Sequence, residues 1–202
     1  VGCNNARELL SLASLKVIPS VGIDQSGAFL EQGRVLAKAA GLEPRLIEAD
    51  IYDLPDDVGT FDLVLVTIGV LNWMPDLGGF FRVIAGLLGP GGHLLVYETH
   101  PVMEMFDPES DTPHEPAISY FRTDPLKEEG LISYDGVDHG SGETGYWFIH
   151  TLGQIVTSCA TAGMTITSLK EFGYSIREPE YDVYEGREAQ IPMSYLLHAR
   201  KM

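Results

Sequence analysis

Two aspartates and two histidines stand where short apolar segments of the chain end or begin. Asp24 follows the apolar residues 21–23, and Asp50 follows a second such segment about 25 residues later. His100 follows the apolar run 93–99, and His150 precedes a stretch with helical periodicity. Carboxylates accept hydrogen bonds from sugar hydroxyls, and a histidine with a pKa of about 6.5 can take a proton from an attacking oxygen or nitrogen. We therefore expect a functional site where these segments end.

A tight turn precedes Asp24 by about twenty residues. The chain opens with Val-Gly-Cys-Asn-Asn-Ala-Arg-Glu and continues into apolar residues at helical spacing as far as Leu15. This pattern predicts a strand that ends at Gly2, a turn over residues 3–6 and a helix whose first backbone N–H groups are free to bind a ligand. A turn of this kind, with an acid about twenty residues later at the end of the next strand, is typical of a βαβ nucleoside-binding unit.

The residues of the turn discriminate between two nucleoside cofactors. A dinucleotide such as NAD requires the pattern G-x-G-x-x-G because its pyrophosphate lies against the backbone. Here Gly2 is followed by Asn4 and Ala6 at the third and fifth positions of the turn. A ligand with an amino-acid tail and no phosphate requires less of the turn, and the side-chain amides of Asn4 and Asn5 can meet its carboxylate. S-adenosylmethionine is therefore the better fit.

Five short motifs together resemble those of the class I S-adenosylmethionine-dependent methyltransferases. They are Gly-Cys-Asn-Asn-Ala at 2–6, Val-Gly-Ile-Asp-Gln-Ser at 21–26, Glu-Ala-Asp-Ile at 48–51, Phe-Asp-Leu-Val at 61–64 and Leu-Gly-Pro-Gly-Gly at 88–92. The resemblance implies an α/β fold, a doubly wound and mostly parallel seven-stranded sheet with an antiparallel last strand. It also implies S-adenosylmethionine as the cofactor and S-adenosylhomocysteine as the product. The positions expected at the cofactor are Gly2, Cys3, Asn4, Asn5, Asp24, Gln25, Ser26, Asp50, Ile51, Thr67, Ile68 and Gly69.

Some of these positions also have an ordinary structural explanation. Asp50 could cap the turn 50–53, and Cys3 could simply pack as a small apolar residue. Trp73 follows the apolar strand predicted at 61–68 and could form an aromatic wall beside the cationic methyl donor, an interaction of about 0.5–2 kcal/mol. It could equally anchor its loop to the core.

Residues 100–149 are predicted to form a β-rich insertion on the substrate side of a single domain, 1–202. Short alternating runs predict strands at 118–122, 131–134 and 144–149. The sequence here resembles one bacterial subgroup of the family, which acts on small molecules. The resemblance rests on His100, Tyr120, Trp147 and His150. The resemblance makes His100 and His150 candidate catalytic residues. It places them with Trp73, Tyr120 and Trp147 at the substrate. For His150, a structural hydrogen bond at a helix start is the stronger interpretation.

The remaining elements follow from periodicity and capping residues. Helices are predicted at 26–40, 76–88 and 151–162, and strands at 45–48, 93–99, 164–174 and 191–200, the last two as an antiparallel pair. The chain begins inside the expected first strand without a methionine. We expect further residues before Val1.

Composition limits the classes of function. Thirteen Lys and Arg against 29 Asp and Glu give a formal net charge of −16. Nucleic-acid phosphates would be repelled by this charge, so a small-molecule substrate is favoured. The sequence shows no membrane segment and no metal-ligand cluster, and its 2 cysteines are typical of a cytoplasmic protein. We expect a monomer or a homodimer.

Two other functions stay open. A binding protein of the same fold that has lost transfer activity is conceivable because Asn4 and Ala6 replace glycines. An NAD-dependent oxidoreductase is disfavoured by the same turn.

Overall fold

The computed structural model describes residues 1–129, 144–176 and 179–202, and it has an α/β fold. The helices are α1 (Arg7–Ser11), α2 (Gly27–Ala40), α3 (Leu77–Leu87) and α4 (Leu152–Thr161), with short 3-10 turns at Leu12–Leu15, Leu71–Trp73, Met103–Met105 and Pro179–Tyr184. The strands are β1 (Val21–Asp24), β2 (Arg45–Glu48), β3 (Phe61–Thr67), β4 (Leu88–Thr99), β5 (Leu126–Glu129), β6 (Thr144–Trp147), β7 (Met164–Phe172) and β8 (Ser194–Lys201). The helices predicted at 26–40, 76–88 and 151–162 and most predicted strands are confirmed. The first predicted helix continues to Leu15 only as a 3-10 turn, and the prediction of a strand ending at Gly2 is wrong, because residues 1–3 join the two parts of the sheet without forming a strand.

The main sheet is mixed and is described in two parts. One part has the order β3-β4-β8-β7, in which β3 and β4 are parallel and β8 is antiparallel to both of its neighbours. The other part is the parallel pair β1-β2. The described strands thus do not form the single seven-stranded sheet that was predicted.

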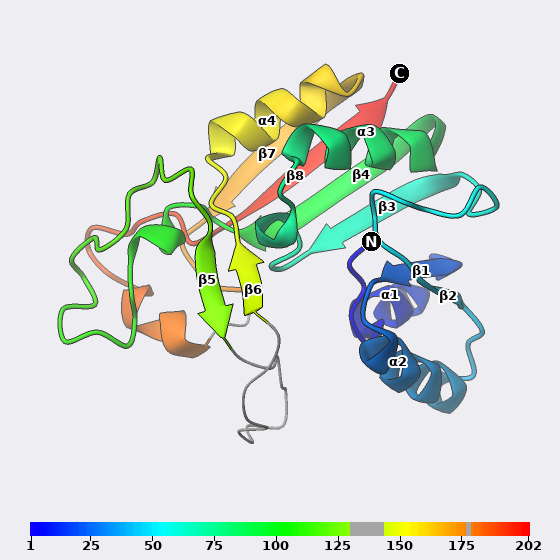
Figure 1. The fold of residues 1–202 in the computed structure, drawn as a ribbon, viewed down its shortest axis with the longest axis horizontal. Helices are drawn as coiled ribbons and strands as arrows, with labels where there is room; N and C mark the ends of the chain where they lie inside the picture. The colour runs from blue at the N-terminus through cyan, green and yellow to red at the C-terminus, as the bar shows by residue number, and fades with distance from the viewer. Residues whose placement is uncertain (130–143, 177–178) are drawn as a thin grey trace.

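Residues 1–3 lie between these two parts of the sheet (Figure 1). The backbone nitrogen of Val1 donates to the carbonyl of Leu65 in β3 at 3.0 Å. The N–H of Cys3 donates to the carbonyl of Ile23 in β1 at 3.0 Å. The first residues therefore bring the carboxyl ends of β1 and β3 to the same place.

Helices α3 and α4 cover one face of the four-stranded part (Figure 1). Phe80, Phe81 and Ile84 of α3 are fully buried and belong to one apolar cluster with the inward residues of β3, β4 and β8. Full burial of side chains of this size stabilises the fold by about 1.5–3 kcal/mol each. The apolar stripe of α3 thus supplies much of the core.

Capping residues set the helix boundaries. The hydroxyl of Ser26 accepts the N–H of Phe29 at 3.4 Å, and α2 ends at Gly41 in the left-handed conformation. Thr151 and Gln154 form a capping box at the start of α4. The structure confirms the predicted starts and ends of these two helices to within about two residues, the usual uncertainty of helix assignment.

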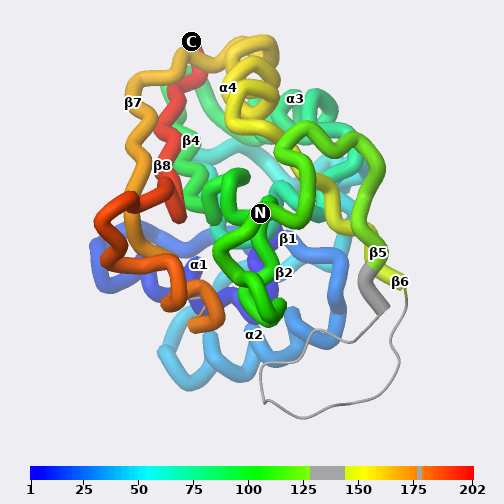
Figure 2. The backbone as a smooth tube through the Cα atoms, turned by 90° about the vertical axis from the view of Figure 1, so that its left-hand side faces the viewer, coloured from blue at the N-terminus to red at the C-terminus, as the bar shows by residue number. Residues whose placement is uncertain are grey.

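The insertion forms one described β-ribbon, β5-β6, and irregular segments that face the viewer in Figure 2. The prediction of a strand at 118–122 is wrong. The N–H groups of Ala117 and Ile118 both donate to the carbonyl of Met105, so this segment folds back on its own loop and has no strand partner. The prediction for 131–134 lies outside the described residues.

Candidate cofactor pocket

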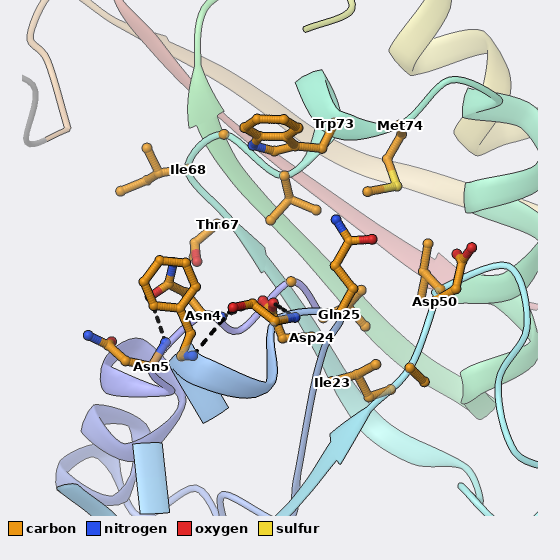
Figure 3. A pocket seen from close by; sticks show the side chains of 18 of the residues that line it. Asn4, Asn5, Ile23, Asp24, Gln25, Asp50, Thr67, Ile68, Trp73 and Met74 are labelled. Atoms are coloured by element: carbon orange, nitrogen blue, oxygen red, sulfur yellow. Dashed lines mark hydrogen bonds between the residues drawn. The ribbon is translucent and has the colours of Figure 1, made fainter. Parts of the chain in front are cut away.

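A cavity of about 430 Å³ lies at the carboxyl ends of β1, β2 and β3 (Figure 3). Every position predicted to meet the cofactor, except Cys3, lines it, and so does Trp73. Residues that the prediction missed also line it: Val1, Arg7, Glu8, Ile23, Phe29, Ala49, Tyr52, Val70, Met74 and Pro75. Ligands of open α/β sheets bind at this edge, and the volume is that of a small-molecule site.

The turn on one side of the pocket has a left-handed backbone at three alternate residues. Gly2, Asn4 and Ala6 have φ values of 59°, 48° and 59°. Asparagine tolerates this region better than most residues, and the Asn4 amide oxygen further holds the turn by accepting the N–H of Asn5 at 2.7 Å. The chain therefore adopts a turn for which glycine is better suited, although glycine is present only at the first position.

Asp24 joins this turn to the start of α2. One carboxylate oxygen accepts the N–H of Asn4 at 2.7 Å, and the other accepts the N–H of Ser26 at 2.9 Å. An ionised carboxylate has about four acceptor sites, so about two remain for hydroxyl groups of a ligand. In Figure 3, Asp24 lies at the centre of the pocket, between Asn4 and Gln25.

The end of β2 contributes Asp50 and Ile51. The Asp50 carboxylate accepts the N–H of Tyr52 at 2.9 Å, so the capping role considered for Asp50 is present. Ile51 is buried, and the Tyr52 hydroxyl donates to the carbonyl of Asp76 at 2.9 Å. Met74 lies near Asp50 in Figure 3, on the side of the pocket away from Asn5.

The segment 68–74 forms the wall opposite the turn. Gly69 has a φ of 86°, and a side chain there would meet the Trp147 ring at 3.5 Å. Trp73 and Trp147 pack edge to face, with ring centroids 5.3 Å apart. Trp73 therefore lines the cavity and also anchors its segment to the insertion, and its contact with a cationic methyl donor stays a prediction.

Glu104 connects this wall to the insertion. Its carboxylate accepts the indole N–H of Trp147 at 2.8 Å and the side-chain N–H of Asn72 at 3.3 Å. Asn72 also exchanges two hydrogen bonds with the backbone of Phe148, at 2.7 and 3.0 Å. Sequence reasoning missed Glu104, because the residues that it joins are distant along the chain.

His100 and His150 contact backbone and side chains of the protein and do not line the cavity. His100 is 4% exposed; its Nδ1 accepts the N–H of Val102, and its Nε2 lies 3.0 Å from the Glu171 carboxylate. Burial lowers the pKa of His100, and the charge of Glu171 opposes that shift. His150 Nε2 donates to the carbonyl of Met74 at 2.8 Å, and burial lowers its pKa as well. The predicted catalytic roles of both residues stay predictions.

Tyr120 and Cys3 also lie outside the cavity. The Tyr120 hydroxyl accepts the N–H of Leu152 at the start of α4 at 3.0 Å. Cys3 instead faces a separate apolar groove between α1 and β3, and burial raises the pKa of its thiol to about 11. The Cys3 thiol is therefore protonated at neutral pH and unreactive.

Within residues 1–129, 144–176 and 179–202, no three His, Cys, Asp or Glu side chains cluster so that they could hold a metal ion. No helix in these ranges has both the length and the apolar character needed to cross a membrane.

The chain is similar in sequence to known methyltransferases over part of its length. Residues 1–96 match a family model described as a methyltransferase domain. The chain is 40% identical over 84 residues to a demethylmenaquinone methyltransferase from Thermus thermophilus, a match that covers 40% of this chain and 36% of that protein. The chain thus spans about a third of the curated relative that it matches.

The solved structures extend the similarity to the whole chain. An S-adenosylmethionine-dependent methyltransferase from Mesorhizobium loti has a TM-score of 0.66 and 20% identity, over 99% of this chain and 88% of that one. The glycopeptide N-methyltransferase MtfA in complex with S-adenosylmethionine has a TM-score of 0.60 and 15% identity, over 100% of this chain and 85% of that one. At these identities, the comparisons establish the fold.

Proposed function

We propose that this protein transfers a methyl group from S-adenosylmethionine to a small molecule, because residues 1–96 match a methyltransferase-domain model and the whole chain has the fold of S-adenosylmethionine-dependent methyltransferases. The observation that carries the proposal is the position of Asp24. Its carboxylate is held by two backbone N–H groups at the centre of the pocket and keeps about two acceptor sites for the two ribose hydroxyls.

The pocket fits the chemical groups of the cofactor. Asn4 and Asn5 lie on the side where an amino-acid tail would bind, because side-chain amides pair with a carboxylate. Ile51 and Met74 provide apolar surface for the adenine, beside Asp50. Bound there, S-adenosylmethionine supplies an already activated methyl group.

The protein then has to align the acceptor. Gly69 lets the acceptor approach the pocket closely, and the edge-to-face pair of Trp73 and Trp147 borders that approach. Alignment of two reactants can contribute about 7–11 kcal/mol to lowering the barrier. Proton removal by His100 or His150 is required only when the acceptor arrives protonated, and it remains a proposal.

The substrate is proposed to be small and not a nucleic acid, since the net charge of −16 opposes phosphate binding.

A single sheet that continues from β1 through residues 1–3 to β3 is also part of the proposal, supported by the backbone hydrogen bonds of Val1 and Cys3.

The test is turnover with a panel of acceptors, including a naphthoquinol because the T. thermophilus relative is named for demethylmenaquinone. Formation of S-adenosylhomocysteine, measured by mass spectrometry, supports the proposal. Tight cofactor binding without turnover on any acceptor would favour the non-catalytic binding protein. Binding of NADH in preference to S-adenosylmethionine would favour the oxidoreductase.

A variant of the wall separates acceptor binding from cofactor binding. Replacing Trp147 with alanine removes an aromatic pair of about 0.5–1.5 kcal/mol. We expect the acceptor KM to rise by a larger factor than the Kd of S-adenosylhomocysteine, because Trp147 borders the approach of the acceptor and does not itself line the cofactor cavity. Tyr146→Phe, at the exposed neighbour on β6, is the matched control.

A further inference from the structure

Glu98 is a buried carboxylate behind the wall of the cofactor pocket. It lies near the end of β4, where the side chains of Leu94, Val96 and Glu98 alternate toward the core, and it is 2% exposed. Buried glutamates are rare unless they are hydrogen-bonded. Hydrogen-bond donors are therefore needed to compensate the burial of this carboxylate.

The carboxylate binds consecutive backbone N–H groups of the wall. One oxygen accepts the N–H of Gly69 at 2.5 Å, the other accepts the N–H of Leu71 at 3.1 Å, and the N–H of Val70 also faces the carboxylate. Gly69 and Val70 line the cofactor pocket on their other side. The conformation of residues 69–71 at the pocket therefore depends on an acceptor that does not itself reach the ligand.

Three titratable side chains share a small cavity with Glu98. A cavity of about 10 Å³, room for about one water molecule, is lined by Glu98, Tyr195 of β8, Glu104 and His150. The Tyr195 hydroxyl is fully buried and has no hydrogen-bond partner among the described residues. Glu104 adds negative charge, and His150 is a weak base because burial lowers its pKa. No Lys or Arg among the described residues lines this small cavity.

We propose that Glu98 is a positioning residue for the cofactor pocket: its ionised carboxylate holds residues 69–71 in the conformation that binds the cofactor. The inference rests on the proposed function for the identity of the ligand. Protonation would put a hydrogen on a carboxylate oxygen that now accepts a backbone N–H, and so would weaken the hydrogen bonds between Glu98 and residues 69–71.

The charge state of Glu98 gives the proposal a pH signature. Burial raises the pKa of Glu98 to about 7, and the backbone N–H groups only partly oppose that shift. Because the ionised form is the competent one, affinity for the cofactor falls as the pH drops below about 7. With that pKa, the competent fraction changes about tenfold between pH 8 and pH 6, and the apparent Kd changes by the same factor.

The experiment is a calorimetric titration of the full chain with S-adenosylhomocysteine between pH 6 and pH 8. We expect the wild-type Kd to rise about tenfold from pH 8 to pH 6. Glu98→Gln should bind weakly at both pH values with a nearly constant Kd. Glu43→Gln, which removes an exposed glutamate that does not line the pocket, should follow the wild type. A wild-type pH dependence equal to that of Glu98→Gln would overturn the proposal.

Amide hydrogen exchange of the ligand-free protein separates this proposal from the proposed function. At pH 8, Glu98→Gln should exchange the amides of residues 69–71 at least several-fold faster than the wild type, whereas Glu43→Gln should not. Equal exchange in Glu98→Gln and the wild type would refute the role of Glu98. If neither the wild type nor any variant binds S-adenosylhomocysteine but this exchange difference is present, the proposed ligand is wrong. The conclusion that Glu98 fixes the conformation of residues 69–71 is then still supported.

Discussion

Replacing Asp24 with asparagine is the sharpest test of the pocket, because the change keeps the shape and removes the charge. Asp24 accepts backbone N–H groups from Asn4 and Ser26, which leaves about two acceptor sites for the ribose. Asparagine has one acceptor oxygen, and its NH₂ group would face a backbone donor or a ribose hydroxyl. Loss of a hydrogen bond to a charged acceptor costs about 1.5–3 kcal/mol, so the Kd of S-adenosylhomocysteine should rise about 10- to 150-fold.

Calorimetry should measure this change for S-adenosylhomocysteine and for adenosine, because the lost contact is to the ribose that both contain. Asp56→Asn is the matched control, since it removes the same charge from an exposed residue that does not line the cavity. Thermal unfolding has to accompany the titration, because the unpaired N–H groups can lower the melting temperature. An Asp24→Asn protein that remains folded and binds both ligands as tightly as the wild type would refute the assignment of this pocket to a nucleoside.

Three further perturbations have defined outcomes. Gly2→Ala places a methyl group 2.5 Å from a methyl carbon of Val70, at a residue with a left-handed backbone. Thermal unfolding should therefore show a lower melting temperature, and calorimetry should show weaker binding of S-adenosylhomocysteine. An unchanged melting temperature would contradict the geometry of the turn. Glu98 has a folded pKa of about 7, above its ordinary value of 4.5, so the folded state keeps a proton that the unfolded state has released between pH 4.5 and 7. As the pH rises from 4.5 to 7, urea unfolding should therefore show that the free energy of unfolding of the wild type falls by up to about 3 kcal/mol relative to that of Glu98→Gln. A difference between the two proteins that stays constant over this pH range would contradict the raised pKa. His100→Ala removes the contacts to Val102 and Glu171, so the melting temperature should fall while cofactor affinity is unchanged; a loss of turnover with no change in melting temperature would instead assign chemistry to His100.

The cofactor side of the site could be predicted because its signals are local. The motif residues of the turn and of 21–26 are adjacent in sequence, and the caps at Ser26 and Gly41 fix α2 directly behind them. Once consecutive parallel strands are recognised, their carboxyl ends must share one edge. Asp24 and Asp50 were therefore placed correctly at the cavity without knowledge of tertiary contacts.

The acceptor side could not be predicted in the same way, because side-chain contacts between distant residues decide it. Alternation at 118–122 favoured a strand, but backbone bonds to Met105 hold this segment in a loop. His100 was expected at the methyl group, whereas its ring turns toward Glu171 on β7, 71 residues later. Glu98, behind the wall of the cofactor pocket, did have a usable signal, since the two-residue period of β4 puts its carboxylate on the inward face with Leu94 and Val96.

The joint between Asn72 and Phe148 has a consequence for how such a protein can evolve. Asn72 binds Phe148 through the backbone N–H and carbonyl of that residue, so the attachment places no demand on the side chain at position 148. The family model matches residues 1–96 and ends before the insertion. Mutations in the insertion that spare Trp147 and Glu104 can therefore change its shape while its attachment to residues 68–74 stays constant. Under the proposed function, a new acceptor preference can arise in this way without loss of the ability to hold the methyl donor.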